Sequence, residues 1–278
     1  MNTKVENIKG ICRCCQGETI FFNTGVILSH QGIYTKCGAC QSVQVETPFW
    51  IEAAHSKAIS QLDTGLVARC LSSSRLVGVL LLLERKRTSI GFDWGGGTGL
   101  LTRLLRDQGF QVLTHDRYAE GTHAEGFIAN DLQIAEAATF ITAIECFEHL
   151  VDPIADFKDL ASNKDYFIFT TEIIDTPPPN PANQEWWYYM PMSGQHITFA
   201  SARGIDMFRK ILGFNHYVQF GSLHVFSRKK LRRLTRIVLR FKISRSFSIL
   251  LIPEILNRKF ALTLSDKDYL ESLQRGLH

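Results

Sequence analysis

A glycine-rich turn between an acidic strand end and an apolar helix carries the clearest chemical signal in this sequence. The apolar stretch 89–93 ends in a carboxylate, and Gly95, Gly97 and Gly99 follow before leucines at helical spacing begin. Glycines let the backbone turn tightly and approach a ligand at a helix N-terminus without a clash from Cβ atoms. The segment predicts the first strand, turn and helix of a nucleotide-binding α/β domain.

The positions of these glycines discriminate between cofactors. A dinucleotide-binding turn has the pattern G-x-G-x-x-G, whereas this chain has G-x-G-x-G from Gly95, with Leu100 where the third dinucleotide glycine would stand. With Asp93 before the first glycine and Gly99 as the third, the segment resembles motif I of the class I S-adenosylmethionine (SAM) methyltransferases. The resemblance implies a methyl donor, with Asp93 at its methionine end and the glycine turn along it.

Two further carboxylates are candidates for cofactor contacts. Asp116 ends the next apolar stretch, 23 residues after Asp93, where a carboxylate can accept both ribose hydroxyls. The alternative for Asp116 is an exposed turn residue. Asp131 follows the apolar stretch 126–129, and the resemblance places a polar residue there against the adenine amino group. Asn130 could do the same, and either residue could cap a helix.

A second motif follows the expected fourth strand. Glu145, Glu148 and His149 form an E-x-x-E-H pattern that continues into Asp152-Pro153 and resembles a segment of many SAM methyltransferases that borders both cofactor and substrate. The resemblance implies a cofactor contact for Glu145 and acid–base chemistry for Glu148 and His149. Histidine accepts a proton near neutral pH, and a neighbouring carboxylate raises its basicity. The alternative is an architectural Glu-His pair at the base of the next helix.

A loop after the fifth strand concentrates aromatic side chains. Four consecutive aromatics occupy 186–189, which is more than we expect a loop to need for core packing, and loops beyond sheet strands usually carry sites. We therefore expect Trp187 and Tyr188 to stack on a flat ligand such as a sugar. Gln195 would add a directed hydrogen bond, and His196 is the second candidate for the proton acceptor. The alternative is a lid that seals the cofactor cleft without contacting the substrate.

Two cysteine pairs near the N-terminus predict a metal site. Cys12-x-x-Cys15 and Cys37-x-x-Cys40 are separated by 21 residues and can place four thiolates around Zn²⁺. A fragment of about 40 residues has too little core to fold alone, so the metal would supply much of its stability. Cys14 competes with Cys15 but lacks the two-residue spacing, and unpaired buried cysteines or a redox pair are the alternatives. Four thiolates leave no open position, so we expect a structural metal; nothing in the sequence requires a catalytic one.

Strand and helix signals then alternate along the chain. Helical patterns at 50–58 and 66–83 form a connector, after which alternation predicts a parallel sheet covered by helices, with ligands at the carboxyl ends of the strands. The expected strands are 89–93, 111–115, 126–129, 140–146, 166–171, 216–220 and 223–227, and the expected helices between them are 99–108, 132–137, 152–161 and 201–212.

Several motifs in one order carry a family resemblance. The cysteine pairs, Pro48-x-Trp50, Asp93 to Gly99, Glu145 to Leu150, the aromatic run, Gly194-Gln195-His196-Ile197 and Gly221-Ser222-Leu223-His224 together resemble a bacterial family of zinc-knuckle class I SAM methyltransferases associated with surface-polysaccharide biosynthesis, over residues 10–228. This implies an α/β fold with a Rossmann-like seven-stranded class I methyltransferase sheet and a small N-terminal zinc ribbon or knuckle. We expect a zinc-binding module at 1–47, a helical connector at 48–88, a SAM-dependent methyltransferase domain at 89–228 and a basic amphipathic segment at 229–278.

A second, partial resemblance indicates which kind of molecule accepts the methyl group. The chain is similar to sugar C-methyltransferases, which pair a zinc module with this fold, but it lacks their long C-terminal α/β domain. O-methylation of a sugar or glycan precursor of the cell envelope therefore fits better than C-methylation. The mechanism would be an in-line displacement, with the proton of the acceptor hydroxyl passing to His149 or His196.

Composition and the C-terminal segment suggest the setting. The chain has 278 residues, a net charge of +4, seven cysteines and a polar N-terminus without an apolar signal core, which predicts a cytoplasmic protein. The longest apolar run, 76–83, is far short of the ~20 residues that span a bilayer. Basic and aliphatic residues interleave over 228–259, which is typical of peripheral binding at the inner membrane surface or of a helix packed on the domain with a solvated basic face.

Two other functions remain open. Zinc modules and basic tails also accompany RNA methyltransferases, but the aromatic loop lacks an Asn-Pro-Pro-Tyr type signature and the catalytic domain carries no basic stripe, which argues against a nucleic-acid partner. The chain could also be a non-catalytic scaffold that retained the SAM fold, against which the intact motif I and Asp116 count. The sequence does not indicate an oligomeric state.

Overall fold

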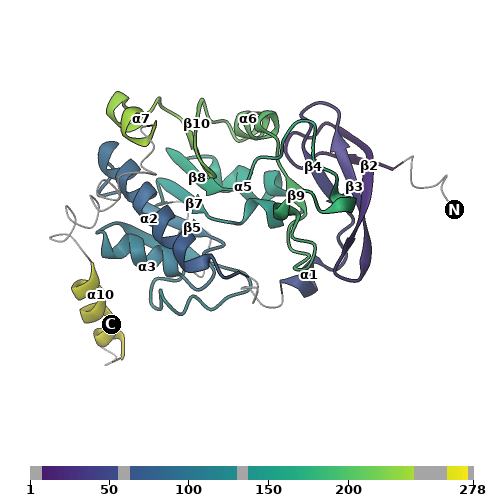
Figure 1. Ribbon diagram of the computed structural model, residues 1–278. Helices are drawn as coiled ribbons and strands as arrows, with labels where there is room; N and C mark the ends of the chain where they lie inside the picture. The colour runs from purple at the N-terminus through teal and green to yellow at the C-terminus, as the bar shows by residue number, and fades with distance from the viewer. Residues whose placement is uncertain (1–7, 56–62, 130–136, 241–261, 275–278) are drawn as a thin grey trace. The chain divides into compact units, whose positions relative to one another are not determined.

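The computed structural model describes residues 8–55, 63–129, 137–240 and 262–274 (Figure 1). The chain divides into two compact units, each built from three separate segments. Unit 1 comprises Met1–Leu62, Glu145–Ser162 and Phe169–Arg228, and unit 2 comprises Asp63–Ile144, Asn163–Ile168 and Lys229–His278.

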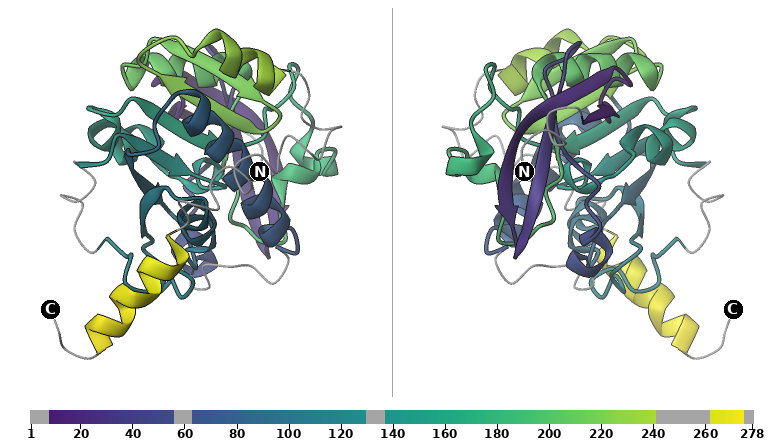
Figure 2. Two further views of the ribbon diagram at one scale, coloured as in Figure 1. Left: turned by 90° about the vertical axis from the view of Figure 1, so that its left-hand side faces the viewer. Right: turned by 90° about the vertical axis from the view of Figure 1, so that its right-hand side faces the viewer.

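Unit 1 contains an antiparallel sheet with the order β1-β2-β3-β4-β9. Its strands are β1 (Lys9–Ile11), β2 (Glu18–Ile27), β3 (His30–Cys37), β4 (Val43–Glu46) and β9 (Thr198–Phe199), and the long pair β2 and β3 forms the purple arrows of Figure 2. The last strand comes from a distant part of the chain, because Val43 pairs with Phe199. The N-terminal module therefore shares its sheet with the aromatic loop region.

The core of unit 1 explains part of the aromatic loop. Residues of β2, β3 and β4 pack there against loop side chains, and the buried members are Ile27, Tyr34, Val43, Val45, Trp50, Ile174, Tyr188, Tyr189, Ile197 and Phe199. Tyr188 and Tyr189 are each only 2% exposed. The expectation that core packing does not need these aromatics is wrong for both tyrosines, because the N-terminal sheet presents apolar side chains that they cover.

Unit 1 also contains short helices: α1 (Ile51–Ala54), η1 (Phe147–His149), α5 (Pro153–Ala161), η2 (Pro181–Asn183), η3 (Trp187–Tyr189) and α6 (Ala202–Ile211). The sequence specifies where the longer two begin. The Asp152 side chain accepts a hydrogen bond from the Ala155 amide and Pro153 follows, and the Ser201 side chain accepts from the Gly204 amide. Both are strong helix starts.

Unit 2 is built around parallel strands. Strand β5 (Ile90–Trp94) pairs in parallel with β6 (Gln111–His115) and with β7 (Phe140–Ala143). Helices α2 (Leu66–Leu83), α3 (Leu100–Asp107), α7 (Arg233–Arg240) and α10 (Thr263–Gln274) belong to the same unit. By length and composition α2 could cross a membrane, with a mean hydropathy of 1.8, but buried core helices of soluble proteins meet the same criteria.

The second sheet has the order β10-β11-β8-β7-β5-β6, where β8 is Tyr166–Thr170, β10 is His216–Phe220 and β11 is Leu223–Ser227. The final two strands pair antiparallel, so the sheet is mixed. Among the described residues it has six strands rather than the expected seven. The stretch 126–129 contributes only one bridge, between Thr114 and Ile128, because Gly126 has a φ of 80° and Phe127 N bonds Ala124 O in a turn.

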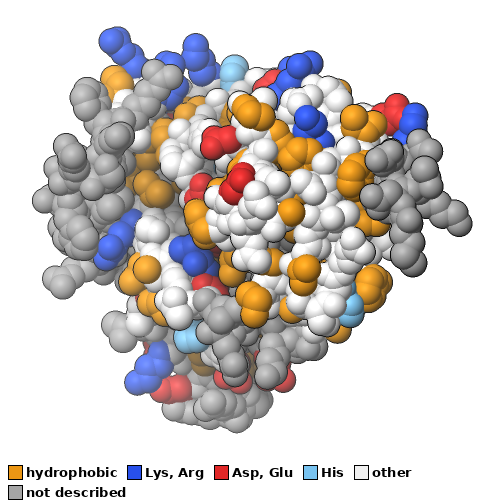
Figure 3. All heavy atoms as spheres, turned by 45° about the vertical axis from the view of Figure 1, so that its right-hand side comes forward, with side chains coloured by type: hydrophobic (Ala, Val, Ile, Leu, Met, Phe, Trp, Pro, Cys, Tyr) orange, Lys and Arg blue, Asp and Glu red, His pale blue; other side chains and the backbone are white. Residues whose placement is uncertain are grey.

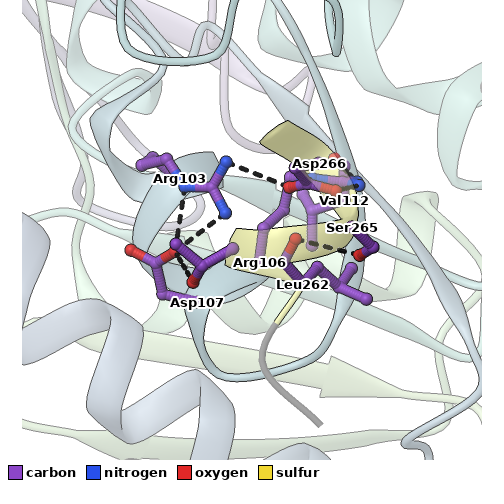
Figure 4. A network of polar contacts seen from close by, with 8 residues as sticks. Arg103, Arg106, Asp107, Val112, Leu262, Ser265 and Asp266 are labelled. Atoms are coloured by element: carbon purple, nitrogen blue, oxygen red, sulfur yellow. Dashed lines mark hydrogen bonds and ion pairs between the residues drawn. The ribbon is translucent and has the colours of Figure 1, made fainter. Parts of the chain in front are cut away.

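The two ends of the expected basic segment are helices in unit 2. Asp266 on α10 accepts two hydrogen bonds from the Arg106 guanidinium, at 2.7 and 2.6 Å, and lies 3.0 Å from Arg103 (Figure 4). Leu262 N donates to Arg106 O, and the Arg106 guanidinium lies 3.6 Å from the centre of the Phe127 ring. Helix α10 therefore packs on α3, whereas residues 241–261 lie outside the described part of the chain.

Candidate functional site

The glycine turn of unit 2 has the geometry of a ligand cradle. Gly97 and Gly99 have φ values of 57° and 77°, a region that favours glycine. A Cβ atom at Gly99 would lie 2.6 Å from the Ala124 Cβ, whereas one at Gly97 would meet nothing within 4 Å. The backbone at Gly97 is therefore open to a ligand, directly before helix α3.

Asp116 lies beside this open turn. Its Oδ2 accepts a hydrogen bond from Gly97 N at 2.9 Å, and its Oδ1 accepts from the amides of Tyr118 and Ala119. A carboxylate has about four acceptor sites, so with three in use one site on Oδ2 is left for a ribose hydroxyl. The structure therefore brings the glycine turn and Asp116 together, and the ribose contact of Asp116 stays a prediction.

Asp93 occupies the interior of the same region. It is 1% exposed, its Oδ1 accepts from the Thr142 hydroxyl at 2.7 Å, and its Oδ2 accepts from the Thr102 hydroxyl at 3.0 Å. Burial raises the pKa of Asp93 to about 7 against the opposing effect of the two hydroxyls. These bonds join β5, β7 and α3, so Asp93 fixes the turn that a cofactor would contact.

Of the two other residues expected to contact the cofactor, the structure describes Glu145 but not Asp131. Glu145 has a φ of 55°, an uncommon conformation for a non-glycine residue that often marks functional sites. Thr170 holds it there, accepting a hydrogen bond from Glu145 N and donating one to Glu145 Oε1. Asp131 and most of the helix expected at 132–137 lie outside the described residues.

The expected acid–base residues come together in unit 1. The ligand atoms of Glu148, His149 and His196 all lie within 4.8 Å of one another, and His149 Nε2 lies 4.0 Å from Glu148 Oε1. Neither carboxyl oxygen of the fully buried Glu148 has a hydrogen-bond partner in the described chain. Burial raises the pKa of Glu148 to about 8 and the charge of Glu145 adds to this, while the nearby hydroxyls of Tyr188 and Thr171 lower it without forming a hydrogen bond of ordinary geometry.

A backbone carbonyl orients His196, and another histidine orients His149. His196 Nδ1 lies 2.7 Å from Tyr188 O, and His149 Nδ1 lies 3.0 Å from Nε2 of a third histidine, His55. His55 Nδ1 in turn lies 2.9 Å from Ile51 O. Sequence reasoning missed His55, because nothing in its spacing within the connector links it to a motif almost a hundred residues later.

The expected substrate residues have three different environments. Trp187 is 70% exposed, which suits stacking on a ligand. Tyr188 is a core residue whose hydroxyl lies 3.3 Å from that of Thr171. Gln195 is 7% exposed and donates a hydrogen bond to Ala54 O at 2.9 Å. A role for these three side chains in substrate binding stays a prediction.

The four predicted metal-binding cysteines form a buried cluster in the turns that follow β1 and β3. The Cys12 and Cys40 sulfurs are 3.6 Å apart and those of Cys15 and Cys37 are 3.5 Å apart, too far for disulfides. Tetrahedral zinc with bonds of about 2.3 Å separates its sulfur ligands by about 3.8 Å. The arrangement therefore fits a four-thiolate zinc site, and Cys14 is not part of it.

Comparison with known proteins identifies the class. A family model described as a methyltransferase domain matches residues 74–218, just over half of the chain. The chain belongs to this methyltransferase family. No curated protein matches it in sequence.

Solved structures are similar only distantly. An O-methyltransferase family protein from Burkholderia thailandensis has 14% identity and a TM-score of 0.45, with the match covering 67% of this chain and 62% of that one. Magnesium protoporphyrin IX methyltransferase from Synechocystis PCC 6803 with bound S-adenosylhomocysteine has 15% identity and a TM-score of 0.43, covering 65% and 93%. The chain thus spans less than two thirds of the Burkholderia protein.

Proposed function

We propose that this protein transfers the methyl group of SAM to a hydroxyl oxygen of a sugar or glycan precursor of the cell envelope. The observation that carries the proposal is the open backbone at Gly97 held beside the Asp116 carboxylate, at the start of helix α3. The positive end of a helix and a carboxylate with spare acceptor capacity suit the charged and hydroxylated parts of SAM.

The reaction needs an oriented oxygen and a group that accepts its proton. The oxygen lone pair forms the new C–O bond while the S–C bond breaks, and its electron pair stays on sulfur, giving S-adenosylhomocysteine. The proposal assigns the proton to His149 or His196, which lie beside the buried Glu148 carboxyl. An exposed aromatic side chain, Trp187, supports a sugar acceptor because such rings stack on sugar faces.

The proposal includes a structural zinc ion at Cys12, Cys15, Cys37 and Cys40. The spacing of the four buried sulfurs supports it, and the closed set of thiolates limits the ion to a structural role.

The setting is also a proposal: a cytoplasmic enzyme with peripheral contact at the inner membrane surface through residues 229–278. Leu234 and Ile237 on α7 are 58% and 40% exposed beside exposed basic residues, which supports contact with an anionic surface. On the face drawn in Figure 3, Lys and Arg side chains are scattered rather than gathered in a stripe, so that face offers little support for an RNA substrate.

A labelled-methyl transfer assay tests the function directly. Full-length protein is incubated with methyl-labelled SAM and, in parallel, with cell-envelope glycan precursors and with total RNA. Label in the glycan fraction, lost in an Asp116→Ala variant, supports the proposal. Label in RNA alone would favour the RNA methyltransferase, and label in neither fraction, with SAM still bound, would favour the non-catalytic scaffold.

A further inference from the structure

Three electron-pair donors converge in the interior of unit 1. Glu148 on η1, His149 at the end of η1 and His196 before β9 each offer one ligand atom, and these atoms lie within 4.8 Å of one another. Glu148 is 0% exposed and His196 is 6% exposed, whereas the His149 side chain is 21% exposed. The cluster is therefore enclosed on the carboxylate side and borders solvent at His149.

The hydrogen bonds of the histidines determine which nitrogen carries a lone pair. Because a carbonyl oxygen only accepts, His196 Nδ1 donates to Tyr188 O, which leaves Nε2 of neutral His196 as the basic nitrogen. His55 Nδ1 likewise donates to Ile51 O, so His55 Nε2 accepts a hydrogen bond from His149 Nδ1. His149 Nε2 then carries the lone pair, and it is the atom 4.0 Å from Glu148 Oε1.

The His149 imidazole is the cationic group 4.0 Å from the Glu148 carboxyl, and it carries a positive charge only when it is protonated. Both Glu148 oxygens are buried without a hydrogen-bond partner in the described chain, and a buried carboxylate in that condition is costly. A shared proton or a cation would offset that cost, and a cation would in addition engage the two imidazole lone pairs.

We propose that Glu148, His149 and His196 bind one divalent transition-metal ion, of the Mn²⁺ or Zn²⁺ type, distinct from the zinc of the cysteine cluster. Two imidazoles and one carboxylate are a ligand set for such ions that leaves coordination positions open. The carbonyl and His55 contacts of the two histidines are the outer hydrogen bonds that metal-binding histidines usually make. Ligand atoms around such an ion stand about 3.0–3.4 Å apart for bonds of ~2.1 Å, so the 4.0 Å between His149 Nε2 and Glu148 Oε1 would shorten by about 1 Å or less on binding.

This inference rests on the proposed function and changes one part of it. The acceptor hydroxyl would bind at an open position of the ion, which lowers the pKa of the hydroxyl, and its proton would pass to water. The oxygen would then take the methyl group from SAM, with the S–C electron pair remaining on sulfur. His149 and His196 would hold the ion instead of accepting the proton.

Mn²⁺ binding to the full-length protein tests the site without relying on activity. Free Mn²⁺ is titrated by electron paramagnetic resonance, because Mn²⁺ prefers oxygen and nitrogen ligands and leaves the cysteine cluster to zinc. We expect one Mn²⁺ site per chain, weakened at least tenfold in Glu148→Gln and in His149→Gln. His216→Gln changes a half-buried histidine elsewhere in unit 1 and should bind Mn²⁺ like the unaltered protein.

Zinc content gives a second reading of the same site. If zinc fills it during purification, the protein should hold two zinc ions per chain and Glu148→Gln one. If Glu148→Gln does not fold, as judged by circular dichroism, the more exposed His149→Gln decides. No Mn²⁺ binding together with one zinc per chain, or equal binding in both variants, would overturn the inference and leave a shared proton as the explanation.

The outcomes separate this inference from the proposed function. If methyl transfer to glycan is unaffected when all metal outside the cysteine cluster is removed, the second metal site is contradicted and the proposed function is supported. If Mn²⁺ binds at these residues but the protein methylates no glycan, the metal site is supported and the glycan acceptor is contradicted.

Discussion

Two buried carboxyl groups in this protein have opposite surroundings. Asp93 receives a hydrogen bond on each oxygen, from Thr142 and from Thr102, whereas neither oxygen of Glu148 receives one within the described residues. Burial raises the pKa of both groups, to about 7 and about 8. A buried carboxyl group whose oxygens both accept hydrogen bonds suits a positioning role. One that accepts none and lies beside two histidines suits a role in binding or proton transfer.

Replacement of Asp116 should weaken SAM binding. Asp116→Ala removes charge-assisted hydrogen bonds to the cofactor worth ~1.5–3 kcal/mol, which corresponds to roughly tenfold or more in affinity. It also removes the acceptor that holds Gly97 N. Calorimetric titration with SAM measures the effect, and Asp159→Ala, at an exposed aspartate of α5, is the matched control. Equal affinity in the two variants would remove Asp116 from the site.

The buried His224 should make stability depend on pH. Its Nε2 donates to Thr171 O and its Nδ1 accepts from the Tyr217 hydroxyl, and burial lowers the pKa of His224 from 6.5 to about 4. A folded-state pKa below the unfolded one means that stability is complete above about pH 6.5 and is lost as the pH falls toward 4. The loss amounts to about 3 kcal/mol.

Urea unfolding at pH 7 and at pH 4.5 measures this loss. His224→Gln should show a smaller fall in the free energy of unfolding than the unaltered protein, because all other titrating groups are shared. An identical fall in both proteins would show that His224 is not buried in its neutral form.

At the scale of elements, local pattern predicted most of the methyltransferase sheet. The expected strands at 111–115, 216–220 and 223–227 are confirmed as β6, β10 and β11, and the helices α3, α5 and α6 lie within two residues of their expected ends. Alternating apolar residues and helix caps are short-range signals, so they can be read from neighbouring residues. They did not reveal β9, which forms only through pairing with β4.

In the candidate site too, the sequence revealed local motifs but not the contacts between distant segments. The glycine turn and Glu148-His149 were visible as motifs, and the four cysteines as spacing. The joining of His55 to His149, and the burial of Tyr188 and Tyr189 under the N-terminal sheet, depend on contacts between distant segments. Such contacts leave no periodic trace in a single sequence.

Zinc should stabilise the β1–β4 region. Protein purified without chelator should contain zinc at the cysteine cluster, and Cys37→Ser should lose that ion and lower the thermal stability of unit 1. Cys14→Ser is a close control, because Cys14 is buried next to the cluster without belonging to it. Elemental analysis reports both variants; equal metal content in Cys37→Ser and the unaltered protein would contradict the assignment.

The contact between α3 and α10 can be tested with two aspartates of one helix. Asp266→Ala leaves the Arg106 charge buried without its bidentate partner, which typically costs about 3–5 kcal/mol, whereas Asp268 is exposed. Asp266→Ala should therefore speed hydrogen exchange in α10, and Asp268→Ala should not. Equal exchange in the two variants would show that the ion pair does not hold α10.

At the scale of the whole molecule, the two units alternate along the chain in six segments. The basic stretch that starts at 228 coincides with the last change of unit, but no sequence signal marks the changes at Glu145 and Asn163, so the sequence favours consecutive domains at 1–47, 48–88, 89–228 and 229–278. That division stays a prediction.

Membrane contact is a property of the full-length protein and can be measured by sedimentation with lipid vesicles. The full-length protein should sediment with anionic vesicles at low salt and less at high salt, because each basic residue near such a surface contributes about 1 kcal/mol. Charge reversal of the exposed residues Lys229, Lys230 and Arg233 to glutamate should abolish the adhesion. Equal sedimentation of both proteins would exclude the segment as a membrane contact.

The pairing of β4 with β9 has a consequence for synthesis on the ribosome. Val43 and its partner Phe199 are 156 positions apart, so β4 leaves the ribosome long before β9 exists. At ~5–20 residues per second the delay is on the order of ten seconds. During that time β4 presents an open strand edge that can pair with other nascent chains. Slower elongation between the two strands should therefore increase aggregation of newly made protein, even though the finished chain closes that edge itself.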